Sequence, residues 1–392
     1  MRTGLMLLVG FIGAAFAQAP VGVQALGAAA CRAELIGFDA ANGFLLRRDG
    51  KDLFVPFETT VALTADPIAA LIKPSGIRVT LLDGTTLHGV PGAADRDGFP
   101  LETQGAGVLP LLLDCIERID FAEAELPAAS ADDDVLCFRR SSSVDALSGE
   151  VLAFGRDGVR FRSAAGERTW NAQRDGVVGL KLRTQAAVQT AAAPSAVVTL
   201  KDGSRLSGTL TGPGLRLRLC GGATAMLDLA RVAVIEPRSA QFMRLSDAAP
   251  SAVLHRPLLD GTQLPAFACD RGLAPGSPLQ TGSTQWRRGI VLRAYSEASW
   301  DIQDRGWRRF SAHVGADAAQ LRAGVRATVR VQVCADSIVL WRSDELVAGE
   351  NAVALDVAIP RGAKALRVIV EHATSRATGA CAVIADALLH SP

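Results

Sequence analysis

Aromatic and charged side chains gather in one segment of the last third of the chain. Four of the five tryptophans and the only tyrosine lie beyond residue 280. A sugar presents an apolar C–H face and a ring of hydroxyls, so a site for it combines an aromatic platform with charged or amide hydrogen-bond partners. One short stretch supplies both kinds of group. Its candidate carbohydrate-binding residues are Trp286, Arg288, Arg293, Tyr295 and Glu297.

Core packing competes with binding as the role of the remaining aromatic residues of this region. Trp300, Trp307 and Trp341 lie in the same region of the chain. We expect these three tryptophans to pack in the core of the domain that carries them. The chemistry that a tryptophan offers is therefore not enough to assign it to a site.

The standard catalytic signatures are absent from the sequence. It contains no Gly-x-Ser-x-Gly, His-Glu-x-x-His, P-loop or Rossmann glycine pattern, and its five histidines are widely separated. Most acidic residues stand in Asp-Gly turns or at strand ends, where turn chemistry accounts for them. We predict a protein that is not an enzyme. The alternative is a pair of carboxylates facing each other in a cleft, which would suffice for glycoside hydrolysis.

Charge and the first residues bear on partners and location. The chain has 41 basic and 40 acidic residues, a net charge of +1, which gives no field to attract nucleic acid or an anionic membrane. Arg2, an apolar run and Ala15-Phe16-Ala17 predict a signal peptide over residues 1–17, with a mature start at Gln18. We expect a secreted or periplasmic, cell-envelope protein that does not insert in a membrane after cleavage.

Seven cysteines are scattered without a Cys-x-x-Cys spacing, which argues against a zinc knuckle or a redox pair. In an exported protein some of them would form disulfides, but an odd number leaves at least one unpaired in a monomer. Cys334 and Cys381 are a candidate pair if the strands that carry them are neighbours. The alternative is that both are buried as free thiols.

Two pairs of similar segments precede the aromatic-rich region. Residues 79–89 and 198–208 each contain an Asp-Gly between alternating strands, the pattern of a tight type I′ hairpin turn. Residues 36–51 and 151–163 share a second frame with Asn-Gly or Asp-Gly. The repetition predicts two small antiparallel barrels or sheets. The predicted boundaries are a first β-repeat domain at 31–121, a linker of small and acidic residues at 122–144, and a second β-repeat domain at 145–237.

Short sequence blocks follow one another in a fixed order in the rest of the chain. They include Leu245-Ser246-Asp247, Arg288-Gly289-Ile290, Phe310-Ser311-Ala312 leading to Asp317, and Leu366-Arg367-Val368. This series resembles the NPCBM family, also classed as carbohydrate-binding module family 51, over residues 238–392. The resemblance implies a galactose-binding-like jelly-roll β-sandwich at the C-terminus of an exported bacterial protein. It also implies carbohydrate binding.

The chain departs from the family pattern at two places. Arg293 stands where family members tend to have histidine, and Ala380-Cys381-Ala382-Val383-Ile384 replaces an Asp-His-Ala-Asp-Trp block. The fold can survive these changes while sugar or calcium binding is lost. Asp317 and Asp336 match family positions and are candidate calcium ligands, although a turn accounts for each equally well. No other cofactor is expected.

Together these patterns predict an all-β protein: duplicated small antiparallel β-barrel or sheet repeats followed by a galactose-binding-like jelly-roll β-sandwich. We expect it to recognise glycans at a cell surface or in an extracellular matrix, with carbohydrate or cell-envelope components as partners. The alternative is a structural or protein-interaction component of an envelope assembly with a degenerate sugar site. A cleft at Arg293 and Tyr295 with Trp286 on its rim would favour the first function, and dispersal of these side chains the second.

Overall fold

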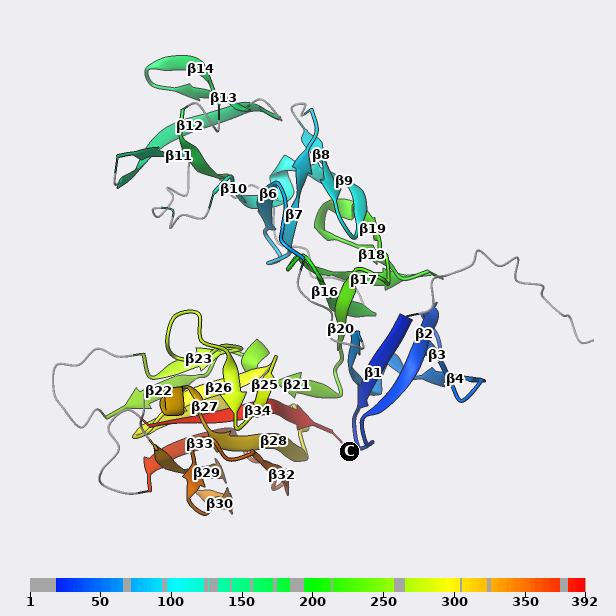
Figure 1. Cartoon of the computed structure of the whole chain (residues 1–392), viewed down its shortest axis with the longest axis vertical. Coiled ribbons are helices and arrows are strands. Elements are labelled where there is room, and N and C mark those ends of the chain that lie inside the picture. Colours follow the sequence, from blue (N-terminus) through cyan, green and yellow to red (C-terminus); the bar gives the residue numbers. More distant parts are fainter. Residues whose placement is uncertain are drawn as a thin grey trace, which may run out of the picture. The chain divides into compact units, whose positions relative to one another are not determined.

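The computed structural model divides into two compact units, Met1–Ser239 and Ala240–Pro392, here called the N-terminal unit and the sandwich unit (Figure 1). The predicted signal peptide 1–17 and mature start Gln18 lie outside the described residues. The boundaries predicted for the separate domains stay predictions. The structure describes residues 19–65, 72–93, 97–122, 126, 133–141, 143–155, 158–171, 175–183, 194–212, 214–256, 265–303, 305–322, 326–373 and 380–391.

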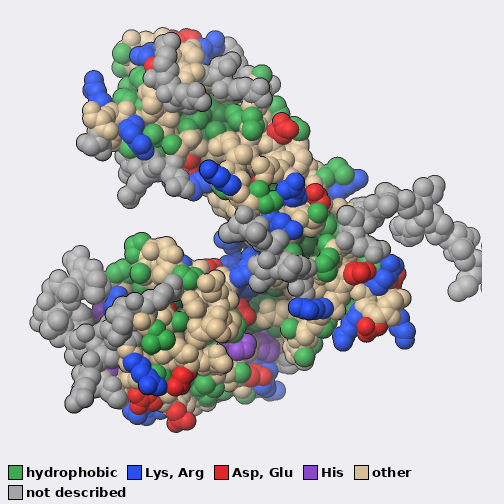
Figure 2. All heavy atoms as spheres, viewed as in Figure 1, with side chains coloured by type: hydrophobic (Ala, Val, Ile, Leu, Met, Phe, Trp, Pro, Cys, Tyr) green, Lys and Arg blue, Asp and Glu red, His purple; other side chains and the backbone are tan. Residues whose placement is uncertain are grey.

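Both units are built almost entirely of antiparallel strands, which confirms the predicted all-β class. The turn-rich, alternating sequence explains this, because Gly, Asp and Asn at short intervals end each strand before a helix could form. No helix in the described part of the chain is long and apolar enough to cross a membrane. On the face seen in Figure 2, basic and acidic side chains are interspersed over the surface.

Twenty strands of the N-terminal unit form one connected sheet and fall into two series of ten. The first series is β1 (Ala19–Ala25), β2 (Cys31–Asp39), β3 (Gly43–Arg48), β4 (Lys51–Val55), β5 (Thr60–Ala65), β6 (Ile77–Leu81), β7 (Thr86–Pro91), β8 (Gly98–Thr103), β9 (Gly107–Leu112) and β10 (Ile116–Asp120), with the 3₁₀ helices η1 (Phe57–Thr59) and η2 (Leu113–Cys115). The second is β11 (Asp134–Arg140), β12 (Ser143–Gly155), β13 (Gly158–Ser163), β14 (Gly166–Trp170), β15 (Val177–Lys181), β16 (Ser195–Leu200), β17 (Arg205–Thr211), β18 (Arg216–Arg218), β19 (Thr224–Met226) and β20 (Val232–Arg238), with η3 (Cys220–Gly222).

The two series pair their strands in the same way. In the first, β1 pairs with β2 and β5, β2 with β3, and β3 with β4; in the second, β11 pairs with β12 and β15, β12 with β13, and β13 with β14. The later strands repeat as well, because β6 pairs with β7 and β10 just as β16 pairs with β17 and β20. The duplication predicted from short motifs therefore extends over ten strands.

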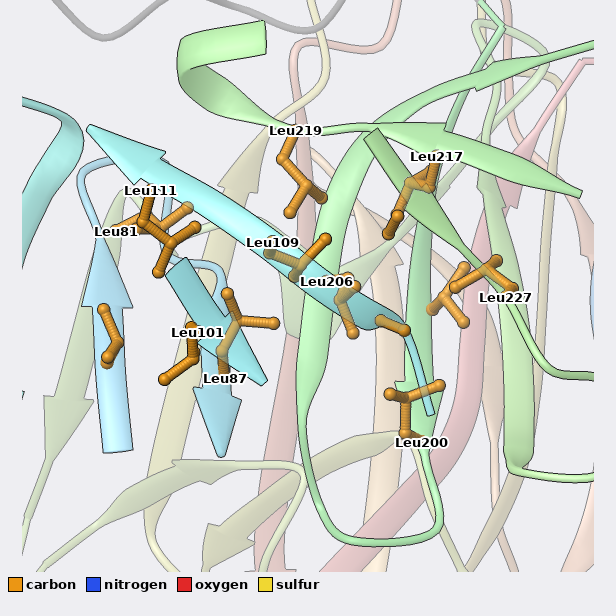
Figure 3. Packing of buried hydrophobic residues seen from close by; sticks show 14 of the residues in the cluster. Leu81, Leu87, Leu101, Leu109, Leu111, Leu200, Leu206, Leu217, Leu219 and Leu227 are labelled. Carbon is orange, nitrogen blue, oxygen red and sulfur yellow. The ribbon is translucent and has the colours of Figure 1, made fainter. Parts of the chain in front are cut away.

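The two series exchange strands with each other. The last strand of each series pairs with the fifth strand of the other: β20 with β5, and β10 with β15. Where the two central hairpins meet, β7 pairs with β17. Leucines of both series pack into one hydrophobic core rather than two, as Figure 3 shows. The series are thus related by a local pseudo-twofold arrangement and share one interior.

Hydrogen bonds at the centre of the N-terminal unit repeat under this pseudo-symmetry. The Thr85 hydroxyl accepts the Ser207 N–H at 2.9 Å, and the Ser204 hydroxyl accepts the His88 N–H at 2.9 Å. Thr85 and Ser204 occupy the same place in the two sequence repeats and are fully buried. A buried hydroxyl without a partner would cost about 1–3 kcal/mol, so these two bonds stabilise the contact between the series.

The Asp-Gly hairpins differ from the predicted two-residue type I′ turns. In the first, the Gly84 N–H donates to Leu81 O at 2.9 Å and the Leu81 N–H donates to Thr85 O at 2.8 Å, which closes a three-residue loop. Only the glycine has a positive φ, 80°. The Asp83 carboxylate accepts the Thr85 N–H at 2.9 Å and keeps the aspartate out of the left-handed region. The predicted turn type is therefore wrong, and the observed loop is a glycine-bulge hairpin.

Residues 134–140 and 143–144, inside the predicted linker 122–144, form β11 and the start of β12. Asp134 explains the difference, because its carboxylate is buried and accepts the N–H groups of Val151 at 2.8 Å and Arg183 at 2.9 Å. An acidic residue taken for a solvated linker residue instead anchors two strands. Sequence composition alone does not distinguish the two roles.

The sandwich unit has two six-stranded sheets, one containing β34 and the other β33, and a two-stranded sheet of β24 and β25 (Figure 1). The β34 sheet has the order β23-β26-β34-β28-β32, with β21 also paired to β34; the β33 sheet has the order β22-β27-β33-β29-β30, with β31 paired to β29. The elements are β21 (Phe242–Arg244), η4 (Leu245–Asp247), β22 (Ala252–His255), β23 (Phe267–Cys269), β24 (Leu279–Thr281), β25 (Thr284–Trp286), β26 (Gly289–Arg293), β27 (Ser296–Asp301), β28 (Arg309–Ala316), α1 (Ala319–Arg322), β29 (Thr328–Ala335), β30 (Ile338–Arg342), β31 (Leu346–Val347), β32 (Val353–Ala358), β33 (Ala365–His372) and β34 (Cys381–His390).

The core of the sandwich lies between these two sheets. Trp300 is 1% exposed and Trp307 is 6% exposed, which confirms that both pack in the core. The Trp300 indole N–H donates to Ala248 O at 3.0 Å, so its polar atom is satisfied. Trp341 differs, because it is only half-buried at the edge of this core.

The candidate disulfide between Cys334 and Cys381 does not form. Val333 and Ala335, on either side of Cys334, point into the core between the sheets, so the Cys334 side chain lies on the outer face of the β33 sheet. Cys381 lies on the outer face of the β34 sheet, in a separate apolar cluster. The two thiols are on opposite sides of the sandwich, and none of the seven cysteines forms a disulfide in this structure.

Candidate functional site

Trp286 lies against the outer face of the β34 sheet, at the end of the β24–β25 hairpin. Its ring stacks on the His313 imidazole with centroids 4.8 Å apart, and its indole N–H donates to the Thr281 hydroxyl at 2.8 Å. The ring also packs against the small apolar cluster that contains Val291 and Val383. Trp286 therefore covers the sheet, with its polar atom already used.

Arg288 joins three segments of the sandwich before β26 begins. Its guanidinium lies 2.6 Å from the Asp270 carboxylate and 3.1 Å from that of Asp247, and its side chain is only 12% exposed. Asp270 also accepts the Gly289 N–H at 3.0 Å. These contacts commit Arg288 to holding the fold together, and they leave little of its guanidinium open to a ligand.

Arg293 and Tyr295 lie at the opposite end of β26. The Arg293 Nε–H donates to Pro265 O at 3.1 Å. Tyr295 occupies the turn to β27 with a φ of 62°, is 38% exposed, and has its ring 4.9 Å from the His372 imidazole. Burial lowers the pKa of His372, which keeps this imidazole neutral near pH 7. Arg293 and Tyr295 thus lie at one end of β26, and the Tyr295 ring contacts a neutral histidine.

Glu297 lies on the outer face of the β33 sheet. Side chains alternate between the two faces of a strand, and Ala298 and Trp300 of β27 point into the core. Its carboxylate pairs with the Arg367 guanidinium at 2.5 Å. The hydrogen bond from Arg367 lowers the pKa of Glu297 below its ordinary value. Glu297 is thus across the sandwich from Trp286. The five predicted residues do not surround one cleft.

The two candidate calcium ligands lie at opposite ends of the sandwich. Asp317 follows the end of β28, close to the start of β34, whereas Asp336 follows the end of β29, where β33 begins. The buried Asp317 carboxylate accepts the Ala319 N–H at 2.9 Å, and that of Asp336 accepts the Ala365 N–H at 2.9 Å. Both act as turn residues, and one ion cannot bind both.

A calcium site also needs a larger set of oxygen ligands than either aspartate provides. Ca²⁺ takes about 6–8 oxygen ligands, commonly from several carboxylates. Among the residues that the structure describes, no group of three His, Cys, Asp or Glu side chains is placed to hold a metal ion. The described side chains therefore do not fit a calcium ion.

A groove of about 220 Å³ lies at one edge of the sandwich unit, here called the Trp341 groove. It is bounded by the end of β28, the end of β30, β31 and the start of β32. This volume is below the ~300–1,000 Å³ of pockets for drug-sized ligands, so it suits a single ring rather than an extended chain. Its aromatic and polar lining residues are Trp341, Arg342, Asp344, Glu345, Glu350 and Asn351.

Two backbone anchors hold the wall of the Trp341 groove. Ser343 is buried, its N–H donates to Val331 O at 2.9 Å, and its hydroxyl accepts the Val331 N–H at 2.9 Å. Leu346 then pairs with β29 as the first residue of β31. Asp344 and Glu345 lie between these anchors and are exposed. Their position is therefore set by the sheet and not by a free loop.

The carboxylates of the Trp341 groove differ from the charged groups of Arg288 and Glu297 in whether the protein itself provides a partner. Within the described part of the chain, Asp344 and Glu345 have no hydrogen bond or ion pair. Arg342 pairs with Glu371 at 3.3 Å outside the groove lining, with both side chains about half exposed. The groove therefore offers a half-buried indole beside hydrogen-bond acceptors that are still available.

Sequence reasoning missed this groove because it assigned Trp341 to the core. One signal was present: the polar run Ser343-Asp344-Glu345, followed by Gly349-Glu350-Asn351, comes directly after a tryptophan-bearing strand. Such runs are also common in ordinary loops. The pairing of β31 with β29 is needed to show that residues of both polar runs line the same groove as the Trp341 indole.

The chain was compared with known proteins. No curated protein matches it. Among solved structures, it is similar to CBM51-2 and INT domains of Clostridium perfringens ZmpB, with 20% identity, a TM-score of 0.33, and 38% of this chain and 32% of that chain covered. It is also similar to a CBM51 module from C. perfringens GH95 in complex with methyl-galactose. The identity is 19%, the TM-score is 0.32, and the match covers 38% of this chain and 99% of that chain.

Tandem CBM51 modules of a family 98 glycoside hydrolase from Streptococcus pneumoniae are also similar, with 14% identity, a TM-score of 0.34, and 81% of this chain and 89% of that chain covered. Identities and TM-scores this low say nothing about function. The family comparison covers most of the sandwich unit, including the whole Trp341 groove. Residues 257–390 match the NPCBM/NEW2 domain family.

Proposed function

We propose that this chain is an exported, non-catalytic carbohydrate-binding protein that recognises a glycan at a cell surface or in an extracellular matrix. The observation that carries the proposal is the match of residues 257–390 to the NPCBM/NEW2 domain family. The binding function belongs to the sandwich unit.

We place the sugar in the Trp341 groove. An indole edge or face binds the apolar side of a sugar ring, and the free Asp344 and Glu345 carboxylates accept hydrogen bonds from its hydroxyls. Asn351 adds a group that both donates and accepts.

The charge of the groove narrows the class of sugar. Three carboxylates, those of Asp344, Glu345 and Glu350, line it together with one guanidinium, that of Arg342. It is unfavourable to bring the carboxylate of an acidic sugar close to these carboxylates, because like charges repel. We therefore expect a neutral sugar or an amino sugar, and we expect uronic and sialic acids to be rejected.

A second candidate function has a specific observation in its favour. Arg288 and Glu297, which the sequence placed in a sugar site, already form ion pairs within the protein, and Arg293 bonds a backbone carbonyl. A sandwich whose charged groups serve its own fold would suit a structural or protein-interaction component of an envelope assembly. In that case the Trp341 groove would hold no sugar.

The test is a glycan array probed with the chain from residue 18 onward, with and without calcium. We expect neutral or amino sugars to be retained, and retention to fall at least tenfold in the Trp341→Ala variant. Tyr295→Ala removes a partly exposed aromatic side chain outside the groove and serves as the matched control. A folded chain that binds no sugar on the array would contradict the proposal and favour the structural function.

A further inference from the structure

Two cysteines of the N-terminal unit lie side by side although they are far apart in the sequence. Cys115 ends η2 in the first series of strands, and Cys220 begins η3 in the second. Cα atoms of these two short helices approach within 8 Å, and Cys115 Sγ lies against Gly221, the residue next to Cys220. The contact therefore links the two series of the duplicated fold.

The backbone of η3 brings this approach about. Gly221 has a φ of 77°, which a residue with a Cβ rarely adopts, and a Cβ built there would lie 2.8 Å from Cys115 Sγ. The absence of a side chain at Gly221 thus lets the Cys115 sulfur lie against the backbone of η3. Both cysteines are half-buried, so a small oxidant can reach them.

The pseudo-symmetry provides an internal comparison. In the corresponding contact of the other half, a Cβ on Gly105 would lie 2.9 Å from the Arg231 Cβ. There the glycine meets an arginine stem, and no thiol is present. The paired cysteines occur at one of two equivalent contacts, so the fold does not require sulfur there.

The other cysteines are placed differently. Cys137 is buried in a separate cluster with Leu126 and Val178. Cys334 and Cys381 lie on opposite faces of the sandwich unit. Pairing among these three thiols would need a change of the fold, whereas Cys115 and Cys220 lie on adjoining segments.

We propose that Cys115 and Cys220 form a disulfide that joins the two series when the chain folds in an oxidising compartment. The two thiols lose two protons and two electrons, and one S–S bond forms. The oxidant is a disulfide, either of a small thiol or of an exchange enzyme; it is reduced to two thiols after a mixed disulfide with one of the cysteines. This bond is independent of sugar binding.

Burial affects the rate of this step. Desolvation, with the neighbouring Cys220 as the next contributor, raises the pKa of Cys115 to about 11. The thiolate is the attacking form, so little of the Cys115 thiol is reactive at neutral pH. Oxidation is therefore best followed at about pH 8.5 over hours, with reduced and oxidised glutathione as the redox buffer.

The test is a peptide map of the folded chain after this incubation, with free thiols alkylated before digestion. We expect one cross-linked peptide pair containing Cys115 and Cys220. The pair should be absent from Cys115→Ser and from Cys220→Ser, and retained in Cys31→Ser as the matched control. Free alkylated Cys115 and Cys220 in the folded wild type, or a different partner for either, would overturn the proposal.

Thermal unfolding gives a second readout that the map does not. The bond closes a loop of about 100 residues, which predicts that the apparent Tm of the N-terminal unit rises by roughly 10 °C on oxidation. Dithiothreitol should remove this rise in the wild type and have no effect on Cys115→Ser. An oxidised chain whose Tm does not rise would show that the crosslink forms outside the native fold, and this would overturn the proposal.

Discussion

Two regions of the sandwich unit contain the same kinds of side chain and use them differently. Around Arg288 and Glu297, each charge lies 2.5–2.6 Å from an opposite charge of the protein itself. In the Trp341 groove, Asp344 and Glu345 have no such partner within the described residues. A binding site therefore needs polar atoms that are still available for a ligand, and residue types alone do not identify it.

The two tryptophans at the extremes of this comparison should differ most in their effect on stability. Trp300→Ala removes a ring that is 1% exposed and should lower the free energy of unfolding of the sandwich unit by about 3–5 kcal/mol. Trp341→Ala removes a half-buried ring, and we expect a loss of about 1–2 kcal/mol. Urea unfolding of the two variants measures both values. Equal losses would place Trp341 in the core and break the comparison.

Arg288→Met tests the paired region. The change removes the cation between the Asp270 and Asp247 carboxylates while keeping most of the apolar stem. Because both carboxylates are partly exposed, we expect a loss of about 2 kcal/mol rather than the full cost of an uncompensated buried charge. Arg342→Met is the matched control, since the Arg342 side chain is 57% exposed and should contribute less than about 0.5 kcal/mol.

The ion pair between Glu297 and Arg367 should make stability depend on acid. The pKa of Glu297 is lowered in the folded chain by the hydrogen bond from Arg367. Its contribution is therefore present above the unfolded pKa of about 4.3 and is lost as the pH falls through the folded pKa. Partial exposure limits it to about 1 kcal/mol. Unfolding midpoints between pH 6 and pH 3 should fall less in Glu297→Gln than in the wild type.

Asp344→Asn and Glu345→Gln should have the smallest effect on stability. Neither carboxylate has a partner to lose, so we expect changes within about 0.5 kcal/mol, the usual range for surface substitutions. Relief of repulsion between neighbouring carboxylates favours a slight gain. A loss well above 1 kcal/mol for either variant would mean that these groups hold the fold, as Arg288 does.

Much of the fold could be predicted from local patterns. Alternating residues between Asp-Gly turns indicated antiparallel strands, and the two similar hairpins at 79–89 and 198–208 indicated a duplication. Such signals are local, because turn residues and strand alternation act over a few positions. The core position of Trp300, within β27, follows from the same alternation.

Pairing between distant segments could not be predicted in this way. The exchange of β5 and β15 between the two series depends on distant contacts, because Leu63 of β5 pairs with Ile235 and Leu180 of β15 pairs with Ile119. The Asp134 carboxylate looked like part of an acidic linker, yet it accepts two backbone N–H groups. Composition is the same for both roles, so only the three-dimensional neighbours decide between them.

The candidate site failed for a related reason. Residues from Trp286 to Glu297 are close in sequence, but successive side chains of a strand point to opposite faces, and the turn at Tyr295 leads β27 into the other sheet. These residues are therefore close in sequence but lie on different faces of the sandwich. The Trp341 groove combines residues 341–351 with the end of β28, and that combination depends on the packing of the two sheets.

The central claim is that free carboxylates beside Trp341 bind a neutral or amino sugar. The most direct test titrates the best array ligand into the wild type and into Glu345→Gln, with Glu297→Gln as a matched control for the loss of one carboxylate. We predict at least a tenfold weaker Kd for Glu345→Gln, and an unchanged Kd for Glu297→Gln, because only the first carboxylate lines the groove. Unchanged binding by Glu345→Gln together with a loss in Glu297→Gln would contradict the account and place the sugar on the outer face of the β33 sheet.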